Sequence, residues 1–353
     1  MMTERRQHHA PALLFERCSS RLQDAGVGVD WAKAAARAMT HASRHGIDSH
    51  GFRLTATYCK MIAAGQVNIK AELKIKRTGP VTALIDADHG LGHYPSYHAV
   101  ELACTMAQES GIGAVGVFGS THNGSAGAYA LAGAEAGFVT LSSTNADAAV
   151  ALHGAAAPFH GTNPIAAAAP IPASRPWLLD MATSSIPLNR VFLYRVLGKE
   201  LPPDAAADAS GEPTLDAAKA EMLMPLGGFG FGYKGAGLAG LVTVLCGALT
   251  GATLDPWMAH MSRAQTSEHR NCGHFFLAIN PEHFGGGAAF GAAMQAYVSA
   301  LRDVPAKEGE TVMAPGDREW AVAAKRDVGG IPIDPVTADF LGFRLSKSCR
   351  LRP

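Results

Sequence analysis

The sequence has no excess of charge of either sign. Its 353 residues include 30 lysines and arginines and 30 aspartates and glutamates, so the formal net charge is zero. Because nucleic acids and anionic membrane surfaces attract basic proteins, this balance gives no reason to expect either as a partner. A small molecule is the expected partner instead. With 48% hydrophobic and 17% charged residues, the composition is typical of a globular protein with a large core.

Closely spaced cysteines and metal-ligand clusters are also missing. The six cysteines are scattered without a Cys-x-x-Cys pair, which argues against a zinc knuckle or a disulfide framework and agrees with a reducing cytoplasm. No carboxylate cluster has ligand spacing, so we expect no bound metal. The N-terminal segment has no long apolar run before a small-residue cleavage site. We therefore expect no secretory signal and a cytoplasmic location.

One uncharged segment raises the question of a membrane span. The chain from Gly235 to Ala252 contains no charged side chain. It is rich in glycine and alanine, and its length is at the lower limit for a helix that crosses a bilayer. We therefore predict a buried helix here and no membrane partner.

Helical and extended patterns alternate along the chain. Apolar spacing predicts helices over 13–22, 31–45, 52–64, 96–109, 125–136 and 289–301. Asp30 is the predicted N-cap of the second helix. Strands are predicted over 73–77, 81–87, 114–118, 138–144, 164–171, 177–182 and 274–280. This alternation predicts an α/β fold of helices layered on a sheet, in which several strands can be antiparallel.

Two glycine-rich segments have the composition of nucleotide-binding loops. Residues 111–116, GIGAVG, match Gly-x-Gly-x-x-Gly, but they run through a predicted strand instead of opening a helix, so we reject a Rossmann fingerprint. Residues 227–235, GGFGFGYKG, offer flexible backbone amides and Lys234 just ahead of a predicted helix. They favour an anion or nucleotide site, and a glycine-rich turn with a solvated lysine is the equally open alternative.

The turn HGIDSHGFR, residues 45–53, concentrates polar side chains between two predicted helices. His50 can deliver a proton near neutral pH, and Asp48 or Ser49 could fix its tautomer. Arg53, one helical turn further on, could hold a carboxylate through two parallel hydrogen bonds. A capped helix with an incidental histidine is the alternative interpretation.

Two further polar positions stand out. His122 lies in the polar turn GSTHNGSAG. Asp180 ends an apolar run, and the C-terminal edge of a strand is a common place for a functional carboxylate in α/β proteins. Each feature alone is also compatible with a capped loop.

Taken in order, a series of segments resembles the malate/L-lactate dehydrogenase family of the non-Rossmann type, which also includes sulfolactate, ureidoglycolate and diketogulonate oxidoreductases and cyclic-imine reductases. The segments are HGIDSHGFRL, DADHGLGH, GIGAVGVFGSTHNGSAGAYA, GTNPIAAAAP, LLDMATS, DASGEPT, PLGG with YKGAGL, GHFFLAINPEHF and APGDRE. The resemblance implies an α/β fold distinct from Rossmann, with a mixed sheet, flanking helices and a helical substrate and dimerisation lobe. In this interpretation residues 111–264 form the nicotinamide cofactor lobe, and residues 1–110 with 265–353 form the other lobe.

The resemblance also implies a function. It predicts an oxidoreductase that uses NAD(H) or NADP(H) and interconverts a small 2-oxo acid and its 2-hydroxy acid, of the malate or lactate type. Reduction of a cyclic imine carboxylate, such as piperideine or pyrroline carboxylate, is the first alternative. A nucleotide-binding protein without catalysis is the second. A homodimer with the active site near the subunit interface is implied as well.

Roles for individual residues follow from the matching motifs. His50 would give the proton to the substrate oxygen, with Ser49 and Asp180 in the same catalytic group. The substrate-binding residues would be Arg53, His122, Thr162 and Met181. The cofactor-binding residues would be His122, Gly124, Thr162, Asp180, Lys234, Gly235, Pro315, Gly316 and Asp317.

Some positions depart from the family pattern. Asn123 stands where phenylalanine is usual, and Asn189-Arg190 stands where Gly-Lys is common. Many members carry the arginine of the histidine turn one position later, at Leu54. These departures bear on which acid is the substrate. The acid, the choice of NAD or NADP, the stereochemistry and the physiological direction depend on side chains that only the fold brings together.

Overall fold

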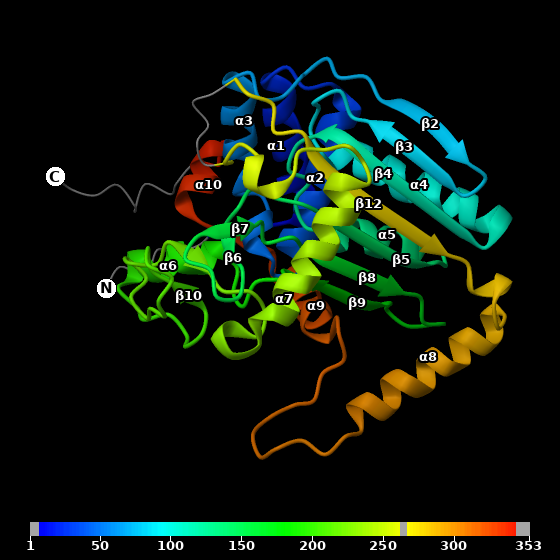
Figure 1. Cartoon of the computed structure of the whole chain (residues 1–353). Helices are drawn as coiled ribbons and strands as arrows, with labels where there is room; N and C mark the ends of the chain where they lie inside the picture. The colour runs from blue at the N-terminus through cyan, green and yellow to red at the C-terminus, as the bar shows by residue number, and fades with distance from the viewer. Residues whose placement is uncertain (1–6, 262–266, 344–353) are drawn as a thin grey trace.

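The computed structural model describes residues 7–261 and 267–343. Its centre is a seven-stranded sheet with the strand order β2-β3-β4-β12-β5-β8-β9 (Figure 1). The strands are β2 (Lys74–Gly79), β3 (Thr82–Asp86), β4 (Ile112–Ser120), β5 (Val139–Thr144), β8 (Ile165–Ala169), β9 (Trp177–Met181) and β12 (Cys272–Ile279). β3 and β4 are parallel, and the other neighbouring pairs are antiparallel. The predicted mixed sheet is confirmed.

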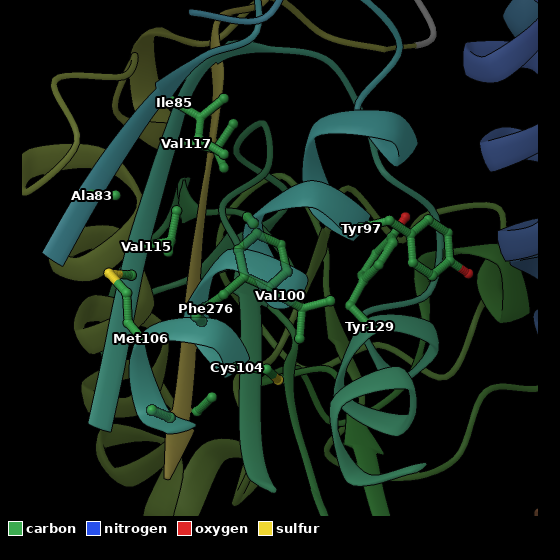
Figure 2. Packing of buried hydrophobic residues seen from close by; sticks show 14 of the residues in the cluster. Ala83, Ile85, Tyr97, Val100, Cys104, Met106, Val115, Val117, Tyr129 and Phe276 are labelled. Atoms are coloured by element: carbon green, nitrogen blue, oxygen red, sulfur yellow. The ribbon is translucent and has the colours of Figure 1, made fainter. Parts of the chain in front are cut away.

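Two helices cover one face of this sheet. α4 (His93–Ser110) connects the parallel strands β3 and β4, as a parallel pair requires, and begins three residues before the predicted start. α5 (Gly127–Glu135) lies beside it. In the core between them, Val115 and Val117 of β4 and Phe276 of β12 pack with Tyr97 and Tyr129 of the helices (Figure 2). Alternate residues of a strand face opposite sides, so every second residue of β4 enters this core.

Close packing on both faces of β4 explains the glycines of GIGAVG. A Cβ atom on Gly113 would lie 2.1 Å from the carbonyl oxygen of Ala103 in α4. A Cβ atom on Gly116 would lie 2.9 Å from Cγ2 of Thr250 on the opposite face. Glycine in a strand marks such a close approach. The segment runs within β4 and opens no helix, so the rejection of a Rossmann fingerprint is confirmed.

A second core joins the first helices of the chain to its C-terminal part, at the upper left of Figure 1. Its elements are α1 (Pro11–Asp24), α2 (Val29–Arg44), α3 (Leu54–Ala63), α10 (Pro335–Phe340) and the antiparallel pair β1 (Gln7–His9) with β13 (Ile331–Ile333). α9 (Asp317–Gly329) contacts α2 and β13 from outside this core. The three predicted N-terminal helices are confirmed. Asp30 as N-cap is wrong, because α2 begins at Val29 after Gly28. Asp30 lies in the first turn instead, where its charge complements the helix dipole.

A smaller unit contains a four-stranded sheet with the order β10-β11-β6-β7. Its strands are β6 (Val150–Ala151), β7 (Pro158–His160), β10 (Ala206–Ala207) and β11 (Met222–Leu223), and α6 (Leu188–Leu197) packs on them. The chain then forms α7 (Gly228–Val242), which continues as the π-helical turn η2 (Thr243–Ala248). α8 (Gly287–Arg302) extends along one side of the molecule (Figure 1).

The predicted burial of the uncharged helix is wrong for the single chain. Buried residues of the continuous helix Gly228–Ala248 form a stripe that includes Gly235, Ala239 and Val242, and only 28% of its most apolar window is buried. Leu241 and Val244 are about half exposed, at 50% and 57%. By length and mean hydropathy, 1.3, this one helix among the described residues could cross a membrane, which is weak evidence by itself.

Strands from both predicted lobes share the large sheet. β2, β3 and β12 belong to the predicted substrate lobe, and β4, β5, β8 and β9 to the predicted cofactor lobe. β12 lies between β4 and β5. The predicted boundaries therefore cut through a single continuous sheet. The assignment of functions to the lobes stays a prediction.

Candidate active site

The histidine turn is held in place from both sides. After α2, the 3-10 turn η1 (Asp48–His50) ends at Gly51, where a Cβ atom would lie 1.9 Å from Ser43 Oγ. Glycine therefore lets the turn fold back onto α2. Arg326 of α9 pairs with the carboxylate of Asp48, with Nη2 3.0 Å from Oδ2. Asp48 is thus engaged by an arginine. The side chain that hydrogen-bonds to His50 is Ser49, whose Oγ lies 2.8 Å from Nδ1 of His50.

His50 lies next to the second predicted histidine. The rings of His50 and His122 are stacked, with centroids 5.6 Å apart. His122 Nδ1 faces the hydroxyl of Tyr58 at 2.7 Å and the backbone amide of Gly124 at 3.3 Å. Because the amide can only donate, Nδ1 accepts and the proton of neutral His122 lies on Nε2. The structure therefore unites Ser49, His50, His122 and Gly124.

Burial makes this cluster neutral in the free chain. It lowers the pKa of His50 from 6.5 to about 4. Burial is the main reason that the pKa of His122 lies well below its usual value. Repulsion from His50 and Arg270, when these carry positive charge, lowers it further. Burial raises the pKa of Tyr58, so the phenol stays protonated. At neutral pH the site therefore contains uncharged imidazoles that can accept a proton.

Tyr58 is a site residue that sequence reasoning missed. It lies in α3, one helical turn after Leu54, and is fully buried. Its ring also meets His93 edge-on at 5.0 Å. In the sequence it resembles any apolar position of a helix, and only its contact with His122 reveals the polar role.

Asp180 ties the end of β9 to the turn that carries His122. Its Oδ2 accepts from Ser125 Oγ at 2.5 Å and from the amide of Gly127 at 3.1 Å. Burial raises the pKa of Asp180, and these two hydrogen bonds oppose that rise. Both recorded hydrogen bonds of its carboxylate thus go to the 124–127 segment, so Asp180 fixes the Gly124 turn.

Thr162 and Met181 lie at adjoining strand ends. The carbonyl oxygen of Thr162 accepts from both the amide and the hydroxyl of Thr183, at 2.9 and 3.1 Å. Met181 pairs with Ile165 across β8 and β9. These two predicted site residues are therefore brought to the same edge of the sheet as Asp180.

Asp255 is the second polar residue that sequence reasoning missed. It is fully buried, and its Oδ2 accepts from Asn163 Nδ2 at 2.7 Å, Thr243 Oγ1 at 2.8 Å and the Gly161 amide at 3.2 Å. Burial pushes the pKa of Asp255 up, but hydrogen bonds, the first from His160, bring it below the usual value. Asp255 therefore clamps the loop on either side of Thr162.

The predicted phosphate segment differs from its expected form. α7 begins at Gly228, so Lys234 does not precede the helix but lies within it, just after a kink at Phe231. Gly235 packs tightly, because a Cβ atom there would lie 2.3 Å from the backbone nitrogen of Leu226. The lysine is exposed, and its ammonium lies 5.3 Å from the Phe231 ring centre. No ion pair of Lys234 is found among the described residues.

The C-terminal predicted residues open α9. The carbonyl oxygen of Pro315 accepts from the Leu178 amide of β9 at 3.2 Å, and Gly316, with φ of 96°, is the N-cap of α9. Asp317 is occupied by Arg302 through both carboxylate oxygens, at 2.9 and 2.5 Å. The carbonyl oxygens of Pro315 and Gly316, the latter bonded by the Trp320 amide, and the carboxylate of Asp317 are therefore all engaged within the chain.

Arg53 and the departing positions lie differently. Arg53 is exposed at the start of α3, near Asp334, and no described contact joins it to His50. Asn123 is fully buried and donates to Ser96 Oγ at 3.0 Å. Asn189-Arg190 lies in the first turn of α6.

The structure thus gathers two neutral histidines, Ser49 and Tyr58 into one candidate site beside the mixed sheet. Over residues 7–261 and 267–343, no group of three or more His, Cys, Asp or Glu side chains could hold a metal ion. The sequence matches the family model for malate/L-lactate dehydrogenase over residues 11–341. The chain belongs to this family.

Curated relatives and solved structures agree with the family. Malate dehydrogenase of Pyrococcus abyssi is 38% identical over 86% of this chain and 84% of its own length. The NADP(+) sulfolactate dehydrogenase of Chromohalobacter salexigens is 34% identical (86% and 88%), and the NAD(+) ureidoglycolate dehydrogenase of Escherichia coli is 30% identical (91% and 90%).

Among solved structures, malate dehydrogenase of Pyrococcus horikoshii superimposes with a TM-score of 0.87 at 31% identity, over 98% of both chains. The delta1-piperideine-2-carboxylate reductase of Pseudomonas syringae pvar. tomato has a TM-score of 0.85 at 27% identity, over 95% of this chain and 98% of its own. The predicted fold is therefore confirmed, and the chain is an enzyme of the oxidoreductase class.

Proposed function

We propose that the protein uses NAD(H) or NADP(H) to interconvert a small 2-oxo acid and its 2-hydroxy acid, with His50 as the acid/base group. The observation that carries this proposal is the stacked pair of His50 and His122, oriented by Ser49 and Tyr58. Relatives named malate, sulfolactate and ureidoglycolate dehydrogenase support the substrate class, and the last two names include NADP(+) and NAD(+).

The described residues suit a nicotinamide dinucleotide. Lys234 offers an exposed cation without an ion pair in the described part of the chain, which suits phosphate. Gly124, with φ of 80°, adopts the left-handed conformation that favours glycine and places its amide against His122. Thr162 and the backbone of Pro315 and Gly316 would hold the rest. The bound cofactor supplies or accepts the hydride.

The side chains of this chain manage the proton. When hydride reaches the carbonyl carbon of a 2-oxo acid, negative charge develops on the oxygen, and a proton from His50 neutralises it. In the reverse direction neutral His50 accepts the hydroxyl proton. Ser49 at Nδ1 fixes the direction in which the ring presents Nε2. The Nε2–H of His122 provides a second donor beside the substrate.

Reduction of a cyclic imine carboxylate is the second candidate. The solved reductase of piperideine-2-carboxylate supports it, because that protein has the same fold. The same proton from His50 would then go to the imine nitrogen. A binding protein without catalysis is less well supported, because Ser49, His50, His122 and Tyr58 form a complete proton-transfer group.

The protein is further proposed to act as a homodimer in the cytoplasm. The outward face of α7 and η2 includes Phe231, Leu241 and Val244, which are 50–61% exposed in the single chain. A second copy that covers this face explains it without a membrane. Cysteines 18, 59, 104, 246 and 272 are free, as suits a reducing compartment.

Turnover of NADH and NADPH with a substrate panel tests the proposal. The panel contains pyruvate, oxaloacetate, sulfopyruvate, diketogulonate and the two cyclic imines. We expect activity on a 2-oxo acid, and a loss in kcat of about a hundredfold or more for His50→Ala. His283→Ala, at an exposed histidine, is the control. Bound cofactor without turnover of any compound would contradict the proposal, and turnover of imines alone would select the second candidate.

A further inference from the structure

Arg270 is an unusual buried cation. Among the described residues, it has the largest side chain of those that are fully buried, and its exposure is 2%. Its Nη2 donates to Asp147 Oδ1 at 2.5 Å, and the other oxygen of Asp147 is taken by His260 Nδ1 at 2.8 Å. Nε and Nη1 of Arg270 have no hydrogen-bond partner among the described residues. Buried donors are normally satisfied, and a guanidinium keeps its charge, so these N–H groups call for an acceptor.

The sheet places Arg270 beside the candidate site. It precedes β12 by two residues, and Cys272 at the start of β12 pairs with Ser120 at the end of β4. His122 follows Ser120 by two residues. The side chain of the intervening Asn271 accepts from the Gly119 amide at 2.7 Å and fixes the two strand ends together. Arg270 and His122 therefore extend from neighbouring strand ends.

Electrostatics agrees with this placement. The charge of Arg270 contributes, after burial and His50, to the low pKa of His122, and it also acts on Tyr58. Both effects agree with a cation on the side of the site that Tyr58 and His122 form. Arg53, by contrast, is exposed.

We propose that Arg270 binds a second acidic group of the substrate, so that the enzyme prefers 2-oxo acids with a carboxylate or sulfonate in addition to the 1-carboxylate. This inference rests on the proposed function and narrows its substrate class. Asp147 holds one corner of the guanidinium, and the anion satisfies the N–H groups that the described part of the chain leaves without a partner. A charge-assisted hydrogen bond of this kind discriminates strongly against a substrate that lacks the anion.

The ratio of kcat/KM values for oxaloacetate, sulfopyruvate and pyruvate tests the inference. We expect wild type to favour at least one of the two dianions over pyruvate by more than tenfold. Arg270→Gln should lower kcat/KM for that dianion by about tenfold to a hundredfold and change the value for pyruvate less than threefold. Arg270→Lys, which keeps the charge, should recover part of the loss. A purely structural arginine would lower all three values together.

Arg44→Gln is the matched control. Arg44 also pairs with a single aspartate, Asp327, through two contacts of 2.6 Å, but at the surface. The Arg44→Gln variant should leave the ratio of kcat/KM for the dianion to kcat/KM for pyruvate unchanged. An Arg270→Gln protein that folds and keeps the wild-type ratio overturns the inference.

A wild-type measurement covers the case in which the variants do not fold. Malonate, a dianion, should inhibit pyruvate reduction at concentrations at least tenfold lower than acetate does. Equal inhibition by the two, or equal kcat/KM for pyruvate and both dianions, overturns the role of Arg270 while the proposed function stands. Absence of turnover with every 2-oxo acid instead contradicts the proposed function itself.

Discussion

At the scale of single residues, His50 connects geometry to a pH profile. Its ring packs against His122 and forms a hydrogen bond with Ser49, and burial lowers the pKa of His50 to about 4. A lowered histidine pKa means that the imidazole is neutral at pH 7 and becomes protonated only in acid. The free enzyme is therefore ready to accept a proton, and must acquire one before it can donate.

The two directions should consequently depend differently on pH. We expect kcat/KM for oxidation of the hydroxy acid to be constant from pH 8 to about 5 and to fall tenfold per unit below about 4, because His50 is then protonated. For reduction, kcat/KM should fall as pH rises from about 4 through neutrality. Initial rates from about pH 3 to 8 check this, with samples returned to about pH 7 to verify that the loss is reversible. A break near 6.5 in both directions would mean that burial does not shift His50.

At the scale of elements, the contact between β9 and the start of α5 sets the Gly124 turn. Gly127 opens α5, and a Cβ atom there would lie 2.6 Å from Oδ2 of Asp180. Only glycine lets the Gly127 amide reach that carboxylate at 3.1 Å. The short approach in turn holds Ser125 and the Gly124 turn.

Gly127→Ala should therefore lower the free energy of unfolding by about 2 kcal/mol and raise the KM for the cofactor, because the methyl group pushes Asp180 from its two donors. Urea unfolding and cofactor titration measure the two effects. Gly329 lies at the end of α9 with open space around the position. Gly329→Ala should therefore change the free energy of unfolding by no more than about 0.5 kcal/mol and leave the KM for the cofactor unchanged. Equal stability of Gly127→Ala and wild type would show that the close approach is not required.

At the scale of the whole molecule, the outward face of α7 and η2 determines the expected assembly. The inner stripe of small residues packs on the chain, while Leu241 and Val244 face outward. Exposed apolar surface of this kind is costly in water and favours association with a second copy.

Leu241→Glu should convert the dimer into a monomer, because a charge would have to enter an apolar interface. Sedimentation velocity at micromolar concentration distinguishes the two states. Val328→Glu is the control, since Val328 is 92% exposed on a different helix, α9. A monomeric wild-type protein, or a dimer that survives Leu241→Glu, would contradict the proposed assembly.

Much of this protein could be predicted from local sequence. Helices over the first 64 residues and the strands of the large sheet follow from apolar periodicity, which depends only on near neighbours along the chain. The histidine turn and the order of the family motifs likewise stand in the sequence. GIGAVG could be separated from a Rossmann loop because its glycines run through a strand pattern.

Only the tertiary structure decided how distant polar groups are paired. Asp48 goes to Arg326, which leaves Ser49 to meet His50, and Tyr58 meets His122 from another element. The exposure of α7 was likewise hidden, because apolar composition cannot distinguish a core from a surface that awaits a partner. Arg270 and His122 are neighbours only because the start of β12 pairs with the end of β4. Local pattern thus determines the elements, whereas long-range contacts set the burial, pairing and charge on which chemistry depends.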